Sequence, residues 1–261
     1  MSKRIKFEVA PEFVGLSLWI KQLQANFAGS GETIFKSRNE VKVFRVGDYQ
    51  LNVKAFRIPN LVNRIVYVYF RNSKAARSFI NARKFFSLNI PTPEAVGFID
   101  FIDNGLLTNS YYISLHHNYK YTLRDAMKFE AGLRDEILRQ WVRFTYLKLH
   151  KNGIYHLDYS PGNTLITETE GTYQFNIVDL NRLQFGSIGF EKGLGNFCRL
   201  EAGRDTLSVI GQEYALLSGE SPEKGATVLR TIEREHDLNT KRVERRKLWF
   251  KNLIKRSENR L

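Results

Sequence analysis

The chain has 261 residues and a formal net charge of +13 at pH 7. A hydrophobic content of 43% and an aromatic content of 13% are typical of a globular protein and exclude an intrinsically disordered one. The single cysteine, Cys198, excludes an internal disulfide and a cysteine-rich zinc site. The first residues lack a secretory signal, and the longest apolar run, 65–70, is too short to cross a bilayer. We therefore expect a soluble, cytoplasmic protein.

The positive charge is concentrated in one part of the chain. No carboxylate occurs between Asp48 and Glu94, whereas that segment contains these lysines and arginines: Lys54, Arg57, Arg64, Arg71, Lys74, Arg77, Arg83 and Lys84. Such a field favours phosphate-rich partners, namely a nucleotide, an anionic lipid or a nucleic acid. A solvated basic surface explains most of these residues equally well when each is taken singly.

Alternating β-forming residues predict a three-stranded antiparallel meander over 33–35, 41–46 and 49–56. A helix is expected over 73–88, because apolar residues recur there on one face. Two further strands, 94–101 and 110–115, follow around an Asp103-Asn104-Gly105 turn. Five strands and one helix then make a small lobe, which we expect to span residues 1–115.

The remaining residues, 116–261, are expected to form a larger and mainly helical lobe. Thr122 and Asp125 resemble a capping box, which marks the start of a helix. The clearest helix covers 133–151, and Asn152-Gly153 supplies its C-terminal stop. Helices dominate again beyond Gly195. The predicted fold class is therefore α+β, with a bilobal arrangement of a small antiparallel lobe and a helical lobe.

Three polar residues between 154 and 181 have the spacing of a phosphoryl-transfer site. Asp158 lies on the loop after the long helix, where a carboxylate can accept a hydrogen bond from an acceptor hydroxyl. Asn163 follows after a Pro-Gly turn, and Asp179 ends a short apolar strand. Turn and strand-end chemistry explains each residue taken alone. Their order favours Asp158 as a catalytic base, with Asn163 and Asp179 as Mg²⁺ ligands.

Two more residues belong to this hypothesis. Lys54 lies in the third strand of the meander, where a lysine would neutralise the phosphates of ATP. The alternative is an exposed strand lysine. His156 is expected to brace the backbone of the loop and to take no part in the chemistry.

These residues resemble the lipopolysaccharide kinase family, kinase-fold enzymes that phosphorylate Kdo or heptose in the inner core of lipopolysaccharide. The resemblance runs from about residue 34 to residue 185, and its motifs lie at 52–56, 73–77, 89–93, 156–163 and 177–182. The resemblance implies ATP and Mg²⁺ as cofactors and a sugar hydroxyl on a lipid-linked glycan as the acceptor. An anionic membrane surface would be contacted by the basic small lobe and by the tail residues Arg242, Arg245, Arg246 and Lys247, at the inner face of the cytoplasmic membrane.

Two features depart from this family. The loop 36–39 between the first two strands contains no glycine, and the expected helix lacks the glutamate near Ala76 that usually pairs with the strand lysine. Asn81, Glu40 or the nucleotide itself is then left to orient Lys54. A pseudokinase that acts as a binding module is therefore an alternative. A basic nucleic-acid-binding protein is a weaker one, because most aromatics lie in apolar periodic segments and no binding motif is present.

Overall fold

The computed structural model describes residues 3–169, 171–200 and 202–258, and the side chains of 247 and 250–258, including Lys247 of the basic tail, lie outside this description. The chain divides into two compact units. The first unit comprises Met1–Thr122 and Asn163–Leu183, and the second comprises Leu123–Gly162 and Gln184–Leu261. No helix among the described residues is long and apolar enough to span a membrane.

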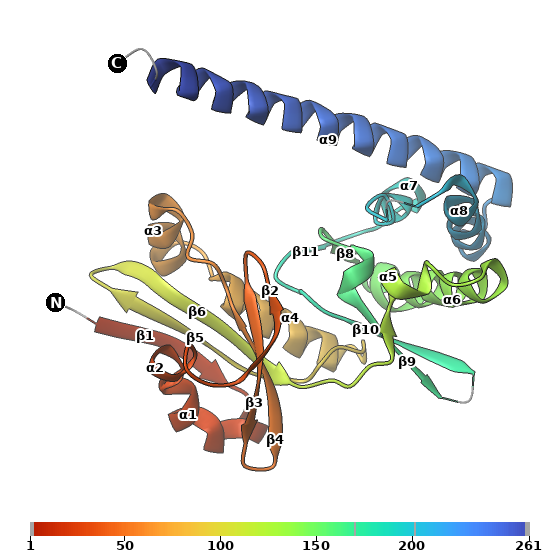
Figure 1. Ribbon diagram of the computed structural model, residues 1–261. Helices are drawn as coiled ribbons and strands as arrows, with labels where there is room; N and C mark the ends of the chain where they lie inside the picture. The colour runs from red at the N-terminus through yellow and green to blue at the C-terminus, as the bar shows by residue number, and fades with distance from the viewer. Residues whose placement is uncertain (1–2, 170, 201, 259–261) are drawn as a thin grey trace. The chain divides into compact units, whose positions relative to one another are not determined.

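An antiparallel six-stranded sheet forms the centre of the first unit (Figure 1), with the strand order β1-β5-β6-β4-β3-β2. Its strands are β1 (Lys3–Val9), β2 (Glu32–Lys36), β3 (Glu40–Val46), β4 (Tyr49–Ala55), β5 (Ala95–Asp103) and β6 (Leu106–Leu115). Both the predicted meander and the predicted strand pair are confirmed. Since β4 is paired on both edges, with β3 and with β6, Lys54 is carried by an inner strand.

Helix α4 (Lys74–Ser87) packs against β5 and β6 and confirms the helix predicted over 73–88. It begins at Ser73, whose hydroxyl accepts a hydrogen bond from the Ala76 amide at 3.0 Å. Its buried face includes Phe79, which contacts Phe98 of β5 with 5.8 Å between ring centroids. Burial of this apolar face fixes which side of α4 points away from the sheet.

The first unit also contains elements that the sequence did not lead us to expect. Strand β1 adds a sixth strand beside β5, and short helices follow it at Pro11–Leu16, α1 (Ser17–Lys21) and α2 (Leu23–Asn26). Helix α3 (Leu61–Tyr69) begins at Asn60, whose side chain accepts from the Asn63 amide at 3.0 Å. Pro59 precedes this cap, so it does not interrupt the helix.

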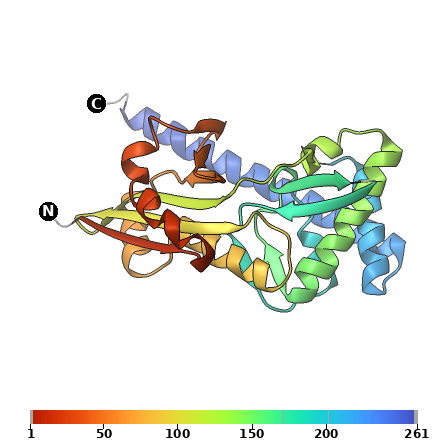
Figure 2. The same ribbon diagram turned by 90° about the horizontal axis from the view of Figure 1, so that it is seen from below.

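A hairpin from the middle of the chain completes the first unit (Figure 2). Strands β9 (Thr164–Thr169) and β10 (Thr172–Ile177) pair with each other, and β9 also pairs with β7 (Tyr121–Thr122). Ile177 is tied to the α4–β5 connection, because its amide donates to Pro91 O at 3.1 Å and its carbonyl accepts from the Thr92 hydroxyl at 2.7 Å. These contacts place residues 163–183 in the first unit. The division into lobes of residues 1–115 and 116–261 stays a prediction.

The second unit is mainly helical and is closed by the long, straight α9 (Figure 1). Four fully buried aromatics, Trp141, Tyr159, Phe197 and Tyr214, lie in its core. The elements are α5 (Leu123–Ala126), α6 (Ala131–Phe144), a π-helical turn (Thr145–Leu149), a 3-10 turn (His150–Asn152), β8 (Ile154–His156), β11 (Leu183–Phe185), α7 (Phe190–Gly195), α8 (Arg204–Ser218) and α9 (Pro222–Glu258).

Gly153 provides a test of how β8 is positioned. Its φ is +67°, and a Cβ there would lie 2.8 Å from Gly186 O. Gly153→Ala should therefore lower the free energy of unfolding by about 1–2 kcal/mol. Gly132→Ala is the matched control, since a Cβ at Gly132 meets nothing within 4 Å, and helix propensity should leave stability unchanged or slightly higher. Urea unfolding followed by circular dichroism measures both, and equal losses would contradict this account.

Candidate functional site

Lys54 and Asp179 form an ion pair within the first unit. The distance from Lys54 Nζ to Asp179 Oδ1 is 2.8 Å, and the two side chains are 20% and 22% exposed. The ammonium group also lies over the Phe56 ring, 5.3 Å from its centroid. Because solvent screens a partly buried pair only weakly, this contact holds the lysine firmly in place. The strand lysine thus has a carboxylate partner, although α4 contains no glutamate.

Neither residue that we had considered as the partner of Lys54 contacts it. Glu40 pairs with Lys36 at 3.5 Å, and Asn81 donates to Leu180 O at 2.5 Å. Arg77, one turn earlier on α4, donates from Nε to Asn181 O at 3.0 Å. Helix α4 therefore orients the lysine only indirectly, by fixing the backbone that carries Asp179.

Asp179 has an unusual backbone conformation. Its φ is +61°, in the left-handed region that aspartate and asparagine adopt more readily than other non-glycine residues. Asn181 donates from its side-chain amide to Asp179 Oδ1, and the two α4 contacts hold the residues that follow. Such conformations persist where surrounding contacts enforce them, and they are enriched at functional sites.

The β9–β10 hairpin brings Asn163 to the same end as Asp179. Thr164 pairs with Ile177 across the hairpin, and Asn163 O accepts from the Val178 amide at 3.0 Å. Among the described residues, no group of three or more His, Cys, Asp and Glu side chains could hold a metal ion. The amide of Asn163 and the carboxylate of Asp179 fit Mg²⁺, which is usually bound through few protein oxygens plus substrate phosphates.

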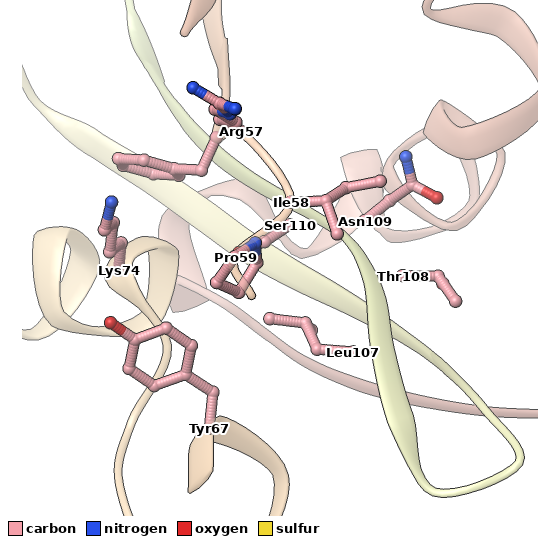
Figure 3. A pocket seen from close by; sticks show the side chains of 10 residues that line it. Arg57, Ile58, Pro59, Tyr67, Lys74, Leu107, Thr108, Asn109 and Ser110 are labelled. Atoms are coloured by element: carbon pink, nitrogen blue, oxygen red, sulfur yellow. The ribbon is translucent and has the colours of Figure 1, made fainter. Parts of the chain in front are cut away.

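A small pocket lies between the end of β4, α3, α4 and β6 (Figure 3). Lys74 and Arg57 line it, and the Tyr67 hydroxyl points toward Lys74. Burial lowers the pKa of Lys74, and the positive charges of Arg182, Arg77 and Arg38 lower it further. This crowding of cations, which includes the arginine directly after Asn181, favours the binding of anions in this part of the unit.

The second unit carries Asp158 on the loop after β8. The Asp158 amide donates to His156 Nδ1 at 3.1 Å, and His156 is buried. Asn196 donates from Nδ2 to His156 O at 2.7 Å. His156 therefore braces the loop through its ring and its backbone.

The carboxylate of Asp158 remains accessible while its surroundings are fixed. It pairs with Arg199 at 3.3 Å, with 34% of the aspartate side chain and 43% of the arginine side chain exposed. Exposed ion pairs of this kind contribute little stability, so Arg199 can release the carboxylate to a substrate. The next residue, Tyr159, is fully buried, stacks on Trp141 at 5.1 Å and contacts the Thr145 hydroxyl at 2.8 Å.

Behind this loop, His150 links α8 to α7. Its Nδ1 lies 2.8 Å from the Tyr214 hydroxyl, and its Nε2 lies 3.0 Å from Asn196 Oδ1. Because an amide oxygen only accepts, Nε2 carries the proton and Nδ1 accepts from Tyr214. Burial lowers the pKa of His150 to about 4, so the ring is neutral at pH 7. Asn196 thereby connects His150 to the backbone of His156.

The four residues expected at the site fall into two groups. Lys54, Asn163 and Asp179 belong to the first unit, and Asp158 belongs to the second. Sequence reasoning missed four residues that position them, namely Asn181, Arg77, Asn196 and Arg199. Asn181 and Arg77 lie inside the motifs at 177–182 and 73–77, which was an available signal. Asn196 and Arg199 had none, because they are distant in sequence from the loop that they contact.

No family model matches the sequence, and neither does any curated protein. Among solved structures, that of WaaP in complex with acyl carrier protein is similar, with a TM-score of 0.60 and 14% identity over 89% of this chain and 98% of that chain. Rio2 kinase from Chaetomium thermophilum, solved with ADP, Mg²⁺ and phosphoaspartate, gives a TM-score of 0.46 and 16% identity over 86% of this chain and 77% of that one. The PknI kinase domain of Mycobacterium tuberculosis gives 0.42 and 17% over 73% and 72%.

The similarity to WaaP establishes the fold. At 14% identity it shows that the chain has a kinase-like fold of mixed helix and sheet, and the predicted fold class is confirmed.

His150 gives the second unit a specific pH dependence. In the unfolded chain its pKa is about 6.5, and in the folded chain it is about 4, so only the unfolded state takes up this proton between those values. The stability contributed by the neutral ring is complete above pH 6.5 and is lost as the pH falls toward 4, by about 3 kcal/mol at most. His150→Gln should flatten the dependence of unfolding free energy on pH over this window. An unchanged slope for His150→Gln would contradict the assignment.

Proposed function

We propose that this chain is an ATP- and Mg²⁺-dependent kinase that transfers the γ-phosphoryl group of ATP to a sugar hydroxyl of the lipopolysaccharide inner core, on Kdo or heptose. The observation that carries the proposal is the Lys54–Asp179 ion pair at 2.8 Å, with Asn163 at the same end of the hairpin, in a kinase-like fold. Phosphoryl transfer requires mainly positioning and charge neutralisation, and these side chains supply both.

Each residue then has one role. Asp158 accepts the hydrogen bond of the acceptor hydroxyl and takes its proton as the new bond forms. Asn163 and Asp179 hold Mg²⁺, and Lys54 neutralises charge on the nucleotide phosphates. When bound, ATP supplies the phosphoryl group, and Mg²⁺ offsets the negative charge of its phosphates. Arg199 keeps the carboxylate of Asp158 in place until the acceptor arrives.

Two observations favour an enzyme over the alternatives. A pseudokinase was suggested by the missing helix glutamate, but Lys54 has a carboxylate partner in Asp179. Against a nucleic-acid-binding protein, the three core aromatics of the second unit, Trp141, Tyr159 and Phe197, are fully buried and are therefore not stacking surfaces.

The acceptor class is supported by the resemblance of the sequence motifs to the lipopolysaccharide kinase family, and the similarity to WaaP supports the kinase-like fold that this acceptor class requires. A glycolipid acceptor places the enzyme at an anionic membrane surface on the cytoplasmic side. The excess of lysine and arginine, which gives the net charge of +13, suits that location.

The role of Asp158 gives the test of this function. Asp158→Asn should lower kcat by about 10²–10⁴-fold, because the amide cannot take the proton of the acceptor hydroxyl. Transfer of labelled phosphate from ATP to Kdo- and heptose-containing lipid-linked acceptors measures the effect. Binding of ATP with Mg²⁺, measured by calorimetry, should stay unchanged in this variant.

Asp48→Asn is the matched control for the same assay. Asp48 lies in the exposed turn between β3 and β4, so its substitution removes an equal charge and should leave kcat as in the wild type. Absence of phosphate transfer by the wild-type chain to every sugar acceptor, or full activity of Asp158→Asn, would overturn the proposal.

A further inference from the structure

Helix α3 turns an apolar face toward solvent. None of its nine residues is buried, and Leu61, Val62, Ile65 and Tyr69 are 60%, 69%, 41% and 59% exposed. Intervals of one, three and four residues place these four side chains on one side of the helix. Phe70, directly after the helix, is 81% exposed and extends this apolar face.

The side of α3 that faces the protein is mixed, since Val66 and Val68 are half-buried there together with Arg64 and Tyr67. Arg64 donates from Nε to Leu107 O of β6 at 2.8 Å. Tyr67 points into the pocket beside Lys74 (Figure 3), and the Arg77 guanidinium lies over its ring, 5.6 Å from the centroid. A surface helix of a globular protein usually buries its apolar stripe and exposes its polar side. In α3 the large apolar side chains Leu61, Val62 and Ile65 lie on the outward side, so most of their surface contributes nothing to the core of this unit.

The segments that flank α3 in the sequence are basic. Arg57 precedes α3, Arg71 follows it, and both are exposed. The helix lies inside the segment between Asp48 and Glu94 that contains no carboxylate. Large apolar side chains on a helix flanked by arginines are characteristic of helices that lie in the interface of an anionic bilayer.

We propose that α3 docks the chain on an anionic lipid bilayer. Leu61, Val62, Ile65, Tyr69 and Phe70 enter the boundary between head groups and acyl chains, and Arg57 and Arg71 pair with lipid phosphates. The inference rests on the proposed function, because an enzyme with a lipid-linked acceptor must reach the membrane. Helix α3 is then the surface that contacts the membrane, and insertion of its apolar side chains accompanies the attraction between arginines and lipid phosphates.

Flotation of the full chain with vesicles, without ATP, tests the proposal. The chain should float with vesicles of 70% phosphatidylcholine and 30% phosphatidylglycerol and much less with phosphatidylcholine alone. Val62→Ser combined with Phe70→Ser should weaken binding to the anionic vesicles by roughly tenfold or more, because two of the five inserted apolar side chains are lost. Both positions are exposed in the free chain, so the variant should fold like the wild type, which a thermal melt checks.

Val14→Ser combined with Leu18→Ser is the matched control. These residues belong to the same unit and are 67% and 70% exposed, so a comparable, slightly smaller amount of exposed apolar surface is removed elsewhere. The control should bind vesicles like the wild type. Equal losses of vesicle binding in the two double variants would overturn insertion of α3. So would a wild-type chain that loses vesicle binding in added salt while the α3 double variant binds as tightly as the wild type.

Three further outcomes separate the remaining explanations. Failure of the wild-type chain to bind anionic vesicles overturns the proposal. So does a lower melting temperature of the α3 variant, which would mean that another part of the chain covers this face. If the α3 double variant loses binding to an acidic carrier protein but binds anionic vesicles like the wild type, the face is a protein interface, and the proposal is also overturned. Because flotation involves no turnover, its result does not depend on whether the chain transfers phosphate.

Discussion

The contact between Lys54 and Asp179 is the constraint on which the candidate site depends. In protein kinases the strand lysine pairs with a glutamate of the helix, and the metal-binding aspartate is a separate group. Here the aspartate at the end of β10 serves as the partner of the lysine, at 2.8 Å and with both side chains about one-fifth exposed. Removing either charge would leave the other partly buried and uncompensated. A nucleotide phosphate could replace Asp179 as the partner of Lys54, and Mg²⁺ could replace Lys54 as the partner of Asp179, without that cost. The pair therefore favours the binding of both ligands together.

Helix α4 supports the site through hydrogen bonds to the backbone after Asp179. It supplies no carboxylate, but Asn81 and Arg77 donate to two successive carbonyl groups, of Leu180 and Asn181. These bonds hold the backbone after Asp179, whose left-handed φ of +61° requires such support. In the second unit the same principle applies to Asp158, since His156, Asn196 and buried Tyr159 fix the loop while the carboxylate reaches solvent. Both candidate carboxylates are therefore rigidly positioned and chemically accessible.

The sequence predicted those parts of the structure that depend on local patterns. Alternation of β-forming residues predicted β2, β3 and β4, and apolar periodicity predicted α4. The spacing of Asp158, Asn163 and Asp179 indicated the site. Strand β1 was missed because its partner β5 lies far along the chain, with Lys3 opposite Asp103. Helix α3 was missed because Pro59 directly before its cap is typical of a break in regular structure, although apolar residues recur on one side of this segment. The Lys54–Asp179 pair could not be predicted either, because nothing local specifies a contact between a strand and a loop so distant in sequence.

Calorimetric titration of the wild-type chain with ATP, in the presence and absence of Mg²⁺, tests the central claim most directly. The account predicts that Mg²⁺ strengthens ATP binding and that Asp179→Asn removes this dependence, since the variant loses the carboxylate that would hold the metal. No ATP binding under either condition, or the same dependence on Mg²⁺ in the variant, would contradict a kinase site built on Lys54 and Asp179.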